Sequence, residues 1–232
     1  MKGRVAIVTG GSGALGQSIA LRFLKDGGTV AVPWIVPEEW KSLQGRVDKG
    51  QAGRLHGANV DLVHDEAGFG AFVADVLARY KGLDVLVNTV GGFAGGDLAS
   101  TSLAEWRRMI DLNLTSAVIA CRAVLPAMRA ARRGRIVNVS SRAVVPPAGG
   151  FIAYTVGKSA VIALTQALAQ EERAHGIGVN AVLPSTMDTP ANRHAMPDAD
   201  HSEWVSTDAV ADAIAYLASD GAGAVSGACV SV

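Results

Sequence analysis

The stretch Thr9-Gly10-Gly11-Ser12-Gly13-Ala14-Leu15-Gly16 joins a β-branched apolar run to an Ala- and Leu-rich run near the start of the chain. Glycines at such a turn let the backbone approach a pyrophosphate without Cβ clashes, and the free N–H groups at the helix start face the anion. A tight turn that needs glycine only for its backbone conformation is the simpler alternative. The strand–turn–helix position favours nucleotide binding. The expected contacts are Gly10, Ser12, Gly13, Ala14, Leu15 and Gly16.

Outward from this turn, short apolar runs alternate with longer Ala- and Leu-rich runs along the whole chain. Strands that are buried on both faces of a parallel sheet have this nearly continuous apolar composition. The repeated strand–helix–strand order predicts one α/β domain over residues 1–232, of Rossmann type, with a doubly wound parallel sheet of about seven strands and helices on both faces. The predicted strands are Arg4–Thr9, Thr29–Trp34, Arg54–Val60, Leu83–Asn88, Arg135–Ser140, Ile177–Leu183 and Ala228–Val232. The predicted helices are Ala14–Lys25, Glu66–Tyr80, Leu103–Ala130, Phe151–Ala174 and Thr207–Ala218.

Composition excludes several other classes of protein. A length of 232 residues fits one large α/β domain, and 49% hydrophobic against 18% charged residues excludes intrinsic disorder. The 21 basic residues balance the 21 acidic ones without a long basic run, so we expect no nucleic-acid partner. Cys121 and Cys229 stand far apart without a Cys/His cluster, which argues against a metal site or a disulfide framework and predicts a cytoplasmic protein. We expect neither a signal peptide nor a membrane partner.

Three polar residues with complementary chemistry follow one of the central strands. Ser141 comes directly after Arg135–Ser140, Tyr154 lies 13 residues further on, and Lys158 lies four residues after Tyr154. Positions i and i+4 share a helix face, so the ammonium is expected to lie beside the phenol and to lower its pKa from about 10. Such a tyrosine can exchange a proton with a carbonyl or an alcohol, and Ser141 can polarise the same oxygen. A lone Tyr-x-x-x-Lys is usually a solvated helix face, so the specificity lies in the combination.

Together these motifs resemble those of the short-chain dehydrogenase/reductase family over essentially the whole chain. The glycine turn follows the family's pattern except at Ala14, and Asn88-Thr89-Val90-Gly91 resembles the family's strand end Asn-Asn-Ala-Gly. Asn113 matches the asparagine that holds a helix kink and a water of the proton relay in this family. The resemblance implies an oxidoreductase that transfers hydride between NAD(H) or NADP(H) and a small-molecule substrate. The implied catalytic residues are Asn113, Ser141, Tyr154 and Lys158.

The resemblance also implies cofactor contacts beyond the glycine turn. Lys158 would bind the ribose beside the nicotinamide, and Asp61 would accept a hydrogen bond from the adenine amino group, with a helix cap as its alternative role. A homo-oligomer, either a dimer or a tetramer, is implied as well. Its interface would contain Leu103–Ala130 and Phe151–Ala174, for which burial against the sheet alone is the alternative. The implied cofactor contacts outside the turn are Trp34, Asp61, Asn88, Gly91, Tyr154, Lys158, Pro184, Met187 and Thr189.

Several segments are similar to quinoid dihydropteridine reductases in particular. They are Gly10–Gly16, Val90–Gly96, Ala181–Pro190 and Asn192–Asp200, and the last two belong to a predicted substrate loop at about residues 184–206. The similarity implies a quinonoid, pterin-like substrate as an alternative to a simple carbonyl or alcohol. Two positions depart from that subgroup, because it lacks a serine at Ser141 and carries an Asp for NADH at Trp34.

The residue that ends the second predicted strand normally decides between the two cofactors. An acidic side chain there bonds the ribose 2′-OH and repels a 2′-phosphate. Trp34 occupies this position and can do neither. Ser12, Gly13 and Ile35 stand where a phosphate-binding Arg or Lys is expected. We therefore predict weak discrimination, with Trp34 packed against the adenosine and both NADH and NADPH accepted.

Other functions find less support among the residues. A non-catalytic NAD(P)-sensing protein would have no use for the proton relay, and a sugar-nucleotide epimerase with the same Tyr–Lys pair usually carries a further C-terminal substrate region. A hydrolase would need a histidine paired with its nucleophile, whereas the five histidines are scattered. His194, His201 and Arg193 are candidate substrate contacts, with a surface salt bridge as the alternative for Arg193. Phe93 and Trp204 are candidates for the pocket wall.

Overall fold

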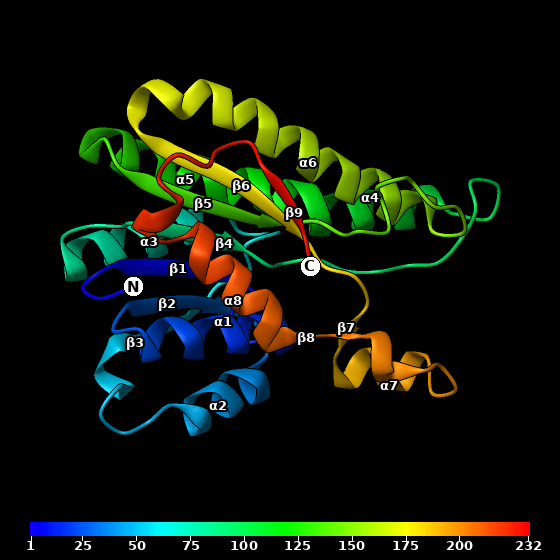
Figure 1. Ribbon diagram of the computed structural model, residues 1–232, viewed down its shortest axis with the longest axis horizontal. Coiled ribbons are helices and arrows are strands. Elements are labelled where there is room, and N and C mark those ends of the chain that lie inside the picture. The colour runs from blue at the N-terminus through cyan, green and yellow to red at the C-terminus, as the bar shows by residue number, and fades with distance from the viewer.

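The central sheet is built from seven parallel strands in the computed structural model, which describes residues 1–232. They are β1 (Val5–Thr9), β2 (Thr29–Trp34), β3 (Leu55–Asn59), β4 (Val85–Asn88), β5 (Gly134–Val139), β6 (Ile177–Leu183) and β9 (Cys229–Ser231). Their order in the sheet is β3-β2-β1-β4-β5-β6-β9 (Figure 1). The order reverses between β1 and β4, and ligands of open α/β sheets bind at such a switch point, beyond the carboxyl ends of the strands. The predicted doubly wound sheet is confirmed.

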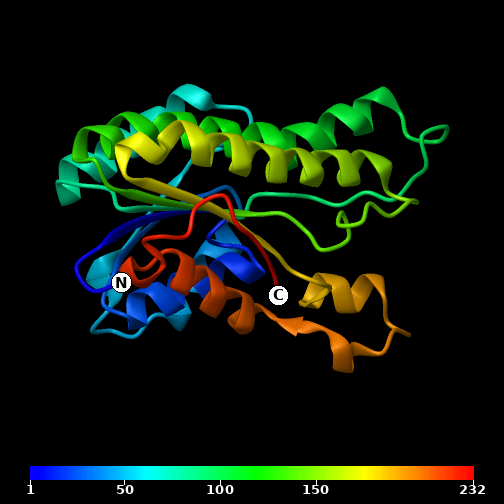
Figure 2. The same cartoon turned by 45° about the horizontal axis from the view of Figure 1, so that its top comes forward.

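Helices cover both faces of this sheet (Figure 2). They are α1 (Ala14–Lys25), α2 (Pro37–Arg46), α3 (Glu66–Tyr80), α4 (Leu103–Ile110), α5 (Ser116–Ala131), α6 (Ile152–Glu172), α7 (Pro190–Ala195) and α8 (Thr207–Leu217). Along β1, Ala6 and Val8 pack with α1 and α8, whereas Val5 and Ile7 pack with α3 and α5. This alternation follows from the two-residue period of a strand, and it produces one hydrophobic core on each face.

Three segments differ from the sequence-based expectation. The predicted helix Leu103–Ala130 is divided by a π-helical turn, Asp111–Thr115, between α4 and α5. Helix α2 was not predicted because it lacks an apolar periodicity: Leu43 is its one buried residue. The predicted substrate loop at about residues 184–206 contains β7 (Met187–Asp188), α7 and β8 (Val205–Ser206), and β7 pairs with β8 in a separate two-stranded sheet.

Two helical stretches are long and apolar enough to cross a membrane by length and composition alone, Leu103–Ala131 and Ile152–His175. The sequence analysis had identified no such segment. In each stretch, 44% of the most apolar 18-residue segment is buried within the chain. Both stretches lie along the same face of the sheet (Figure 2). Their apolar composition therefore has a structural cause, since one side of each helix belongs to the protein core.

Candidate active site

The glycine turn between β1 and α1 forms a cradle with little room for side chains. A Cβ on Gly16 would collide with the Gly10 carbonyl oxygen, and a Cβ on Gly11 would lie 2.8 Å from the Val8 carbonyl oxygen. Gly10 has a φ of +64°, in the left-handed region that favours glycine. Helix α1 begins after Gly13 without a side-chain cap, so the N–H groups of its first turn can face an anion. The turn therefore fits the pyrophosphate of a dinucleotide cofactor.

A second close approach lies beyond the carboxyl end of β4. A Cβ on Gly91 would lie 2.8 Å from Asn113 Oδ1 and 3.1 Å from Lys158 Nζ, so glycine keeps this space open beside two predicted catalytic residues. The side-chain amide of Asn88, a predicted cofactor contact, is engaged within the sheet. Its nitrogen donates to Asn138 Oδ1 at 2.9 Å, and its oxygen accepts from the Thr9 hydroxyl at 3.3 Å. Asn88 thus joins β4 to both neighbouring strands at the edge where the site lies.

Lys158 and Tyr154 occupy successive turns of α6, and Ser141 follows β5. Lys158 is 6% exposed, and its Nζ donates to the Val139 carbonyl oxygen at 2.9 Å. The Ser140 hydroxyl donates to the Lys158 carbonyl oxygen at 2.7 Å. These two contacts fix this part of α6 against the end of β5. The structure therefore brings the three residues together as the sequence predicts.

Burial is the largest influence on the pKa values of Lys158 and Tyr154. It lowers the pKa of Lys158 to about 8. Burial also raises the pKa of Tyr154 above its ordinary value, while the Ser141 side chain acts in the opposite direction. The expectation that Lys158 lowers the pKa of Tyr154 is wrong for this structure, because the ammonium is directed to a backbone oxygen and loss of solvation outweighs other effects on the phenol. A phenol and an ammonium in a shared, largely water-free environment remain suited to proton exchange.

Asn113 lies in the π-helical turn between α4 and α5. Its nitrogen donates to the carbonyl oxygens of Gly92 and Met109, both at 3.0 Å, and its oxygen accepts from the Gly92 N–H at 3.2 Å. The side chain therefore ties the loop after β4 to the interrupted helix. Single π turns are frequent at functional sites, and this one stands where the family resemblance implied a helix kink.

On the β2–β3 side, two predicted cofactor contacts already have partners within the chain. Asp61 Oδ1 accepts from the backbone N–H groups of Val63 at 3.0 Å and His64 at 3.2 Å. Its alternative role as a helix cap is wrong, since the N-cap of α3 is Asp65. The Trp34 ring stacks on another indole: the centroids of Trp34 and Trp40 are 6.1 Å apart and the planes differ by 7°.

Three of the implied cofactor contacts, Pro184, Met187 and Thr189, follow β6. Pro184 is buried, and its carbonyl oxygen accepts from the Arg142 N–H at 2.9 Å, which ties this loop to the one after β5. Met187 lies in β7, and the Thr189 hydroxyl caps α7 by accepting from the Asn192 N–H at 3.2 Å. These three residues lie on one short segment that begins at the carboxyl end of the sheet.

Aromatic rings surround the predicted proton donor. Phe93 meets Tyr154 edge to face with centroids 5.1 Å apart, and Phe151 does so at 6.0 Å. Phe93 is 63% exposed, although a phenylalanine ring favours burial. An exposed aromatic ring beside Tyr154 offers a planar apolar surface to a substrate.

Two polar candidates of the predicted substrate loop, Arg193 and His201, have partners within that loop. Arg193 forms two hydrogen bonds to Asp188, at 2.5 and 2.8 Å, so the salt-bridge alternative describes it. His201 packs on Trp204 with a centroid distance of 4.2 Å and contacts the Met196 carbonyl oxygen at 3.1 Å. Trp204 is therefore held by His201 within its own segment.

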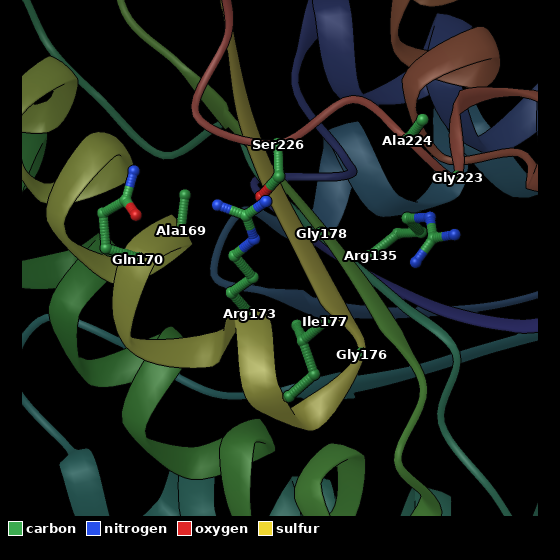
Figure 3. A pocket seen from close by; sticks show the side chains of 10 residues that line it. All are labelled: Arg135, Ala169, Gln170, Arg173, Gly176, Ile177, Gly178, Gly223, Ala224 and Ser226. Carbon is green, nitrogen blue, oxygen red and sulfur yellow. The ribbon is translucent and has the colours of Figure 1, made fainter.

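A cavity of about 470 Å³ lies at the amino-terminal ends of β5 and β6, away from this set (Figure 3). Arg135 and Arg173 contribute its charged lining, and Arg173 extends toward Ser226. None of the predicted site residues lines it. Because ligands of open α/β sheets bind at the carboxyl ends of strands, this cavity is separate from the candidate active site.

The geometry agrees with comparisons to known proteins. A family model described as short chain dehydrogenase matches residues 4–200. The chain is a short-chain dehydrogenase/reductase. It is therefore an oxidoreductase of a family that uses NAD(H) or NADP(H) and acts on small molecules, and a non-catalytic sensor is not favoured.

Relatives of this short-chain dehydrogenase/reductase match nearly its whole length. The 3-oxoacyl-(acyl-carrier-protein) reductase FabG of Chlamydia trachomatis is 32% identical, covering 99% of this chain and 95% of that protein. A short-chain type dehydrogenase/reductase from Mycobacterium ulcerans has a TM-score of 0.94 at 25% identity, covering 100% of this chain and 89% of that one. ElxO, solved with NADP bound, has a TM-score of 0.91 at 26% identity, covering 100% and 97%.

Two contacts near the glycine turn of this short-chain dehydrogenase/reductase were missed by the sequence analysis. Glu39 of α2 and Gln17 of α1 both bond to Ser12. The acidic pair that follows Pro37 was the available signal, but its relevance depended on recognising that a helix starts there. Phe151 was also missed, although its place three residues before Tyr154 puts it near the same helix end.

Proposed function

We propose that this short-chain dehydrogenase/reductase transfers hydride between its nicotinamide cofactor and either a quinonoid, pterin-like compound or a small carbonyl or alcohol, with Tyr154 as the group that exchanges the proton. The observation that supports this proposal is the arrangement at the start of α6. There Tyr154 and Lys158 lie on successive turns, Ser141 faces the phenol, and Gly91 leaves space beside Lys158 and Asn113.

The four predicted catalytic side chains have different tasks in the proposed reaction. A bound nicotinamide cofactor supplies or accepts the hydride. The Tyr154 hydroxyl donates its proton to the substrate in reduction and takes one back in oxidation. With a carbonyl substrate this proton goes to the carbonyl oxygen, which the Ser141 hydroxyl holds by a hydrogen bond. Lys158 holds the cofactor ribose and provides positive charge next to the phenol. Asn113 acts as a positioning residue, since its amide fixes the loop at Gly92.

The remaining predicted contacts would bind the cofactor along the carboxyl edge of the sheet. The glycine turn and the start of α1 would hold the pyrophosphate, as the absence of a side-chain cap at Gly13 permits. Asp61 and Trp34 would lie at the adenosine end, and the segment from Pro184 to Thr189 at the nicotinamide end. Support for this direction comes from the strand order, in which β2 and β5 lie on opposite sides of β1 and β4.

For the substrate we propose a planar quinonoid compound of the pterin type, with a simple carbonyl compound as the second candidate. The similarity of the glycine turn and of the 184–206 segment to quinoid dihydropteridine reductases supports it. The rings of Phe93 and Phe151 beside Tyr154 supply a surface on which a planar heterocycle can stack. Arg193 is paired with Asp188, so the segment offers no free guanidinium there to an anionic substrate.

A substrate panel tests both the reaction and the substrate. The purified protein is mixed with NADH or NADPH and with a quinonoid dihydropterin, a set of small ketones or a 3-oxoacyl thioester, and absorbance of the reduced cofactor is followed. We expect the pterin to be reduced faster than the other compounds. Oxidation of the cofactor by ketones alone would contradict the pterin proposal, and no oxidation with any compound would contradict the proposed reaction.

We also propose that the chain works as a homo-oligomer, either a dimer or a tetramer, in the cytoplasm. The half-exposed apolar helices α5 and α6 are the candidate interface, since a large apolar surface is seldom left in water. Both cysteines are free, which is compatible with a reducing compartment.

A further inference from the structure

Helix α2 brings a carboxylate to the glycine turn. The Ser12 hydroxyl donates to Glu39 Oε2 at 3.1 Å, and Ser12 is 4% exposed. Glu39 itself is exposed, so its carboxylate lies at the surface of the turn. The contact joins residues 27 positions apart and places a negative charge beside the segment that fits the cofactor pyrophosphate.

Several contacts hold α2 in this position. The Gln17 side-chain nitrogen donates to the carbonyl oxygens of Ser12 at 2.8 Å and Glu39 at 3.4 Å. Arg46 Nη1 donates to Gln17 Oε1 at 2.8 Å, so this cation is engaged with an amide oxygen. Next to Glu39, Trp40 stacks on Trp34. Glu39 therefore stands on a helix that is fixed to both α1 and β2.

The sheet order shows which end of a dinucleotide faces Glu39. Tyr154 and Lys158 lie at the ends of β4 and β5, on one side of the switch point. The second nucleoside of the cofactor must therefore extend to the other side, over β1 and β2. Glu39 lies in α2, the element that follows β2, and it contacts the turn after β1, so it is an acidic side chain at that end of the site with a contact to the glycine turn.

We infer that Glu39 sets the cofactor preference of this enzyme in favour of NAD(H). A carboxylate at the adenosine end accepts a hydrogen bond from the ribose 2′-OH and repels a 2′-phosphate, a task that Trp34 at the strand end cannot perform. This inference differs from the expectation of weak discrimination, which considered only the residue at the end of β2. It rests on the proposed cofactor site but not on the proposed substrate or on the role of Tyr154.

The test is equilibrium binding without any substrate. Dissociation constants for NADH and NADPH are measured by calorimetry for the wild type, for Glu39→Gln and for Glu38→Gln. The last variant is the matched control, since it removes the same charge from the neighbouring exposed position on α2. We expect the wild type to bind NADH at least about tenfold more tightly than NADPH, because a charge-assisted hydrogen bond contributes at least that much to affinity. Glu39→Gln should reduce this ratio by about tenfold, while Glu38→Gln should leave it within about twofold of the wild type.

Three outcomes would overturn the inference. They are equal or tighter binding of NADPH by the wild type, an unchanged ratio in Glu39→Gln, and an equal change in Glu38→Gln, which would assign the effect to net charge alone. Thermal unfolding of each variant shows whether α2 keeps its packing. Failure to bind either cofactor would refute the cofactor site itself, whereas preferential NADH binding without turnover would refute only the proposed reaction.

Discussion

Lys158 combines two properties that oppose each other at the level of a single residue. Its ammonium is buried and donates to the Val139 carbonyl oxygen, which favours the charged form, yet the loss of solvation lowers its pKa to about 8. The protein therefore keeps, next to Tyr154, a lysine whose charge can change close to physiological pH. Perturbed groups of this kind are concentrated at functional sites, because structural packing alone favours an apolar side chain there.

Replacing Tyr154 by Phe tests the residue that carries the proposed reaction. The change removes the transferable proton and keeps the ring that packs against Phe93 and Phe151. We expect kcat to fall by about 10²–10⁴-fold, the usual contribution of a positioned general acid, while cofactor binding stays near the wild-type value. Steady-state kinetics with the substrate found in the panel, together with calorimetric titration of NADH, measure both. Near-normal kcat in this variant would refute the assignment.

Replacing Ser141 by Ala distinguishes two types of chemistry at the same site. Quinoid dihydropteridine reductases, which this chain resembles, lack a serine at this position, so a small loss of kcat is expected if the substrate is pterin-like. The contribution of one hydrogen bond to the substrate oxygen is then about fivefold to tenfold. A loss as large as that of Tyr154→Phe, measured in the same assay, would place the enzyme with reductases of simple carbonyl compounds.

The buried lysine also predicts a pH dependence of stability. The pKa of Lys158 is lowered from 10.5 to about 8, so the unfolded chain holds this proton more tightly than the folded one. The resulting destabilisation is fully present below about pH 8 and is relieved as the pH rises toward 10.5. The free energy of unfolding is measured with denaturant for the wild type and for Lys158→Met, at pH 7 and at pH 9.5. Relative to Lys158→Met, the wild type should be more stable at pH 9.5 than it is at pH 7. Lys41→Met, which removes an exposed charge from α2, reports the contribution of net charge.

How much of the site the sequence could predict depended on the sequence distance between its members. Tyr154 and Lys158 are four residues apart on one helix, and the helical period alone places them side by side. The contact between Ser12 and Glu39 joins the turn before α1 to α2, and it depended on a helix that the apolar pattern did not indicate. The direction in which the pKa of Tyr154 is shifted could not be predicted from the sequence either, because burial of the phenol depends on the whole fold.

At the scale of elements, the turn between β1 and α1 predicts a sharp difference between two of its glycines. A Cβ on Gly16 would collide with the backbone of Gly10 and Gly11, whereas a Cβ on Gly13 would meet only the Gly10 carbonyl oxygen at 3.4 Å. We expect Gly16→Ala to lower the unfolding free energy by about 1–3 kcal/mol or more, the usual cost of overpacking, and Gly13→Ala to change it by less than about 1 kcal/mol. Urea unfolding of both variants measures this. Equal stability of the two variants would show that the turn relaxes to admit a side chain.

The elements that the sequence predicted well are those with a continuous apolar pattern. All seven strands of the main sheet were predicted within two residues at either end. The strands β1, β4 and β6 are buried along their whole length, whereas the edge strands β3 and β9 are only partly buried. The π turn at Asp111–Thr115 leaves no such signal, since it changes the hydrogen-bond spacing inside a helix without changing its composition. The segment after Pro184 was expected as a loop because its short elements, β7 and α7, are too brief to show a period.

For the whole molecule, the two longest helical stretches carry more apolar surface than one chain can cover. One side of α5 and one side of α6 pack on the sheet. The opposite side of α6 contains exposed or half-exposed apolar residues such as Val156, Ile162 and Ala163. A second copy that presents the same face would cover this surface through a two-fold axis, which is the commonest symmetry of soluble oligomers. Burial in such an interface would also account for the apolar composition of Leu103–Ala131 and Ile152–His175.

A charge placed on this surface tests the proposed assembly. Ala163 is exposed on α6, so Ala163→Glu would bring an uncompensated charge into the interface of each copy. Removing such a charge from water costs at least about 3 kcal/mol. This cost would raise the dissociation constant of the oligomer by about a hundredfold. Sedimentation velocity should therefore show a dimer or a tetramer for the wild type and a smaller species for Ala163→Glu at the same micromolar concentration. Ala74→Glu, on the exposed side of α3, is the matched control and should sediment like the wild type. A monomeric wild type, or the same loss of mass in both variants, would contradict an interface on α6.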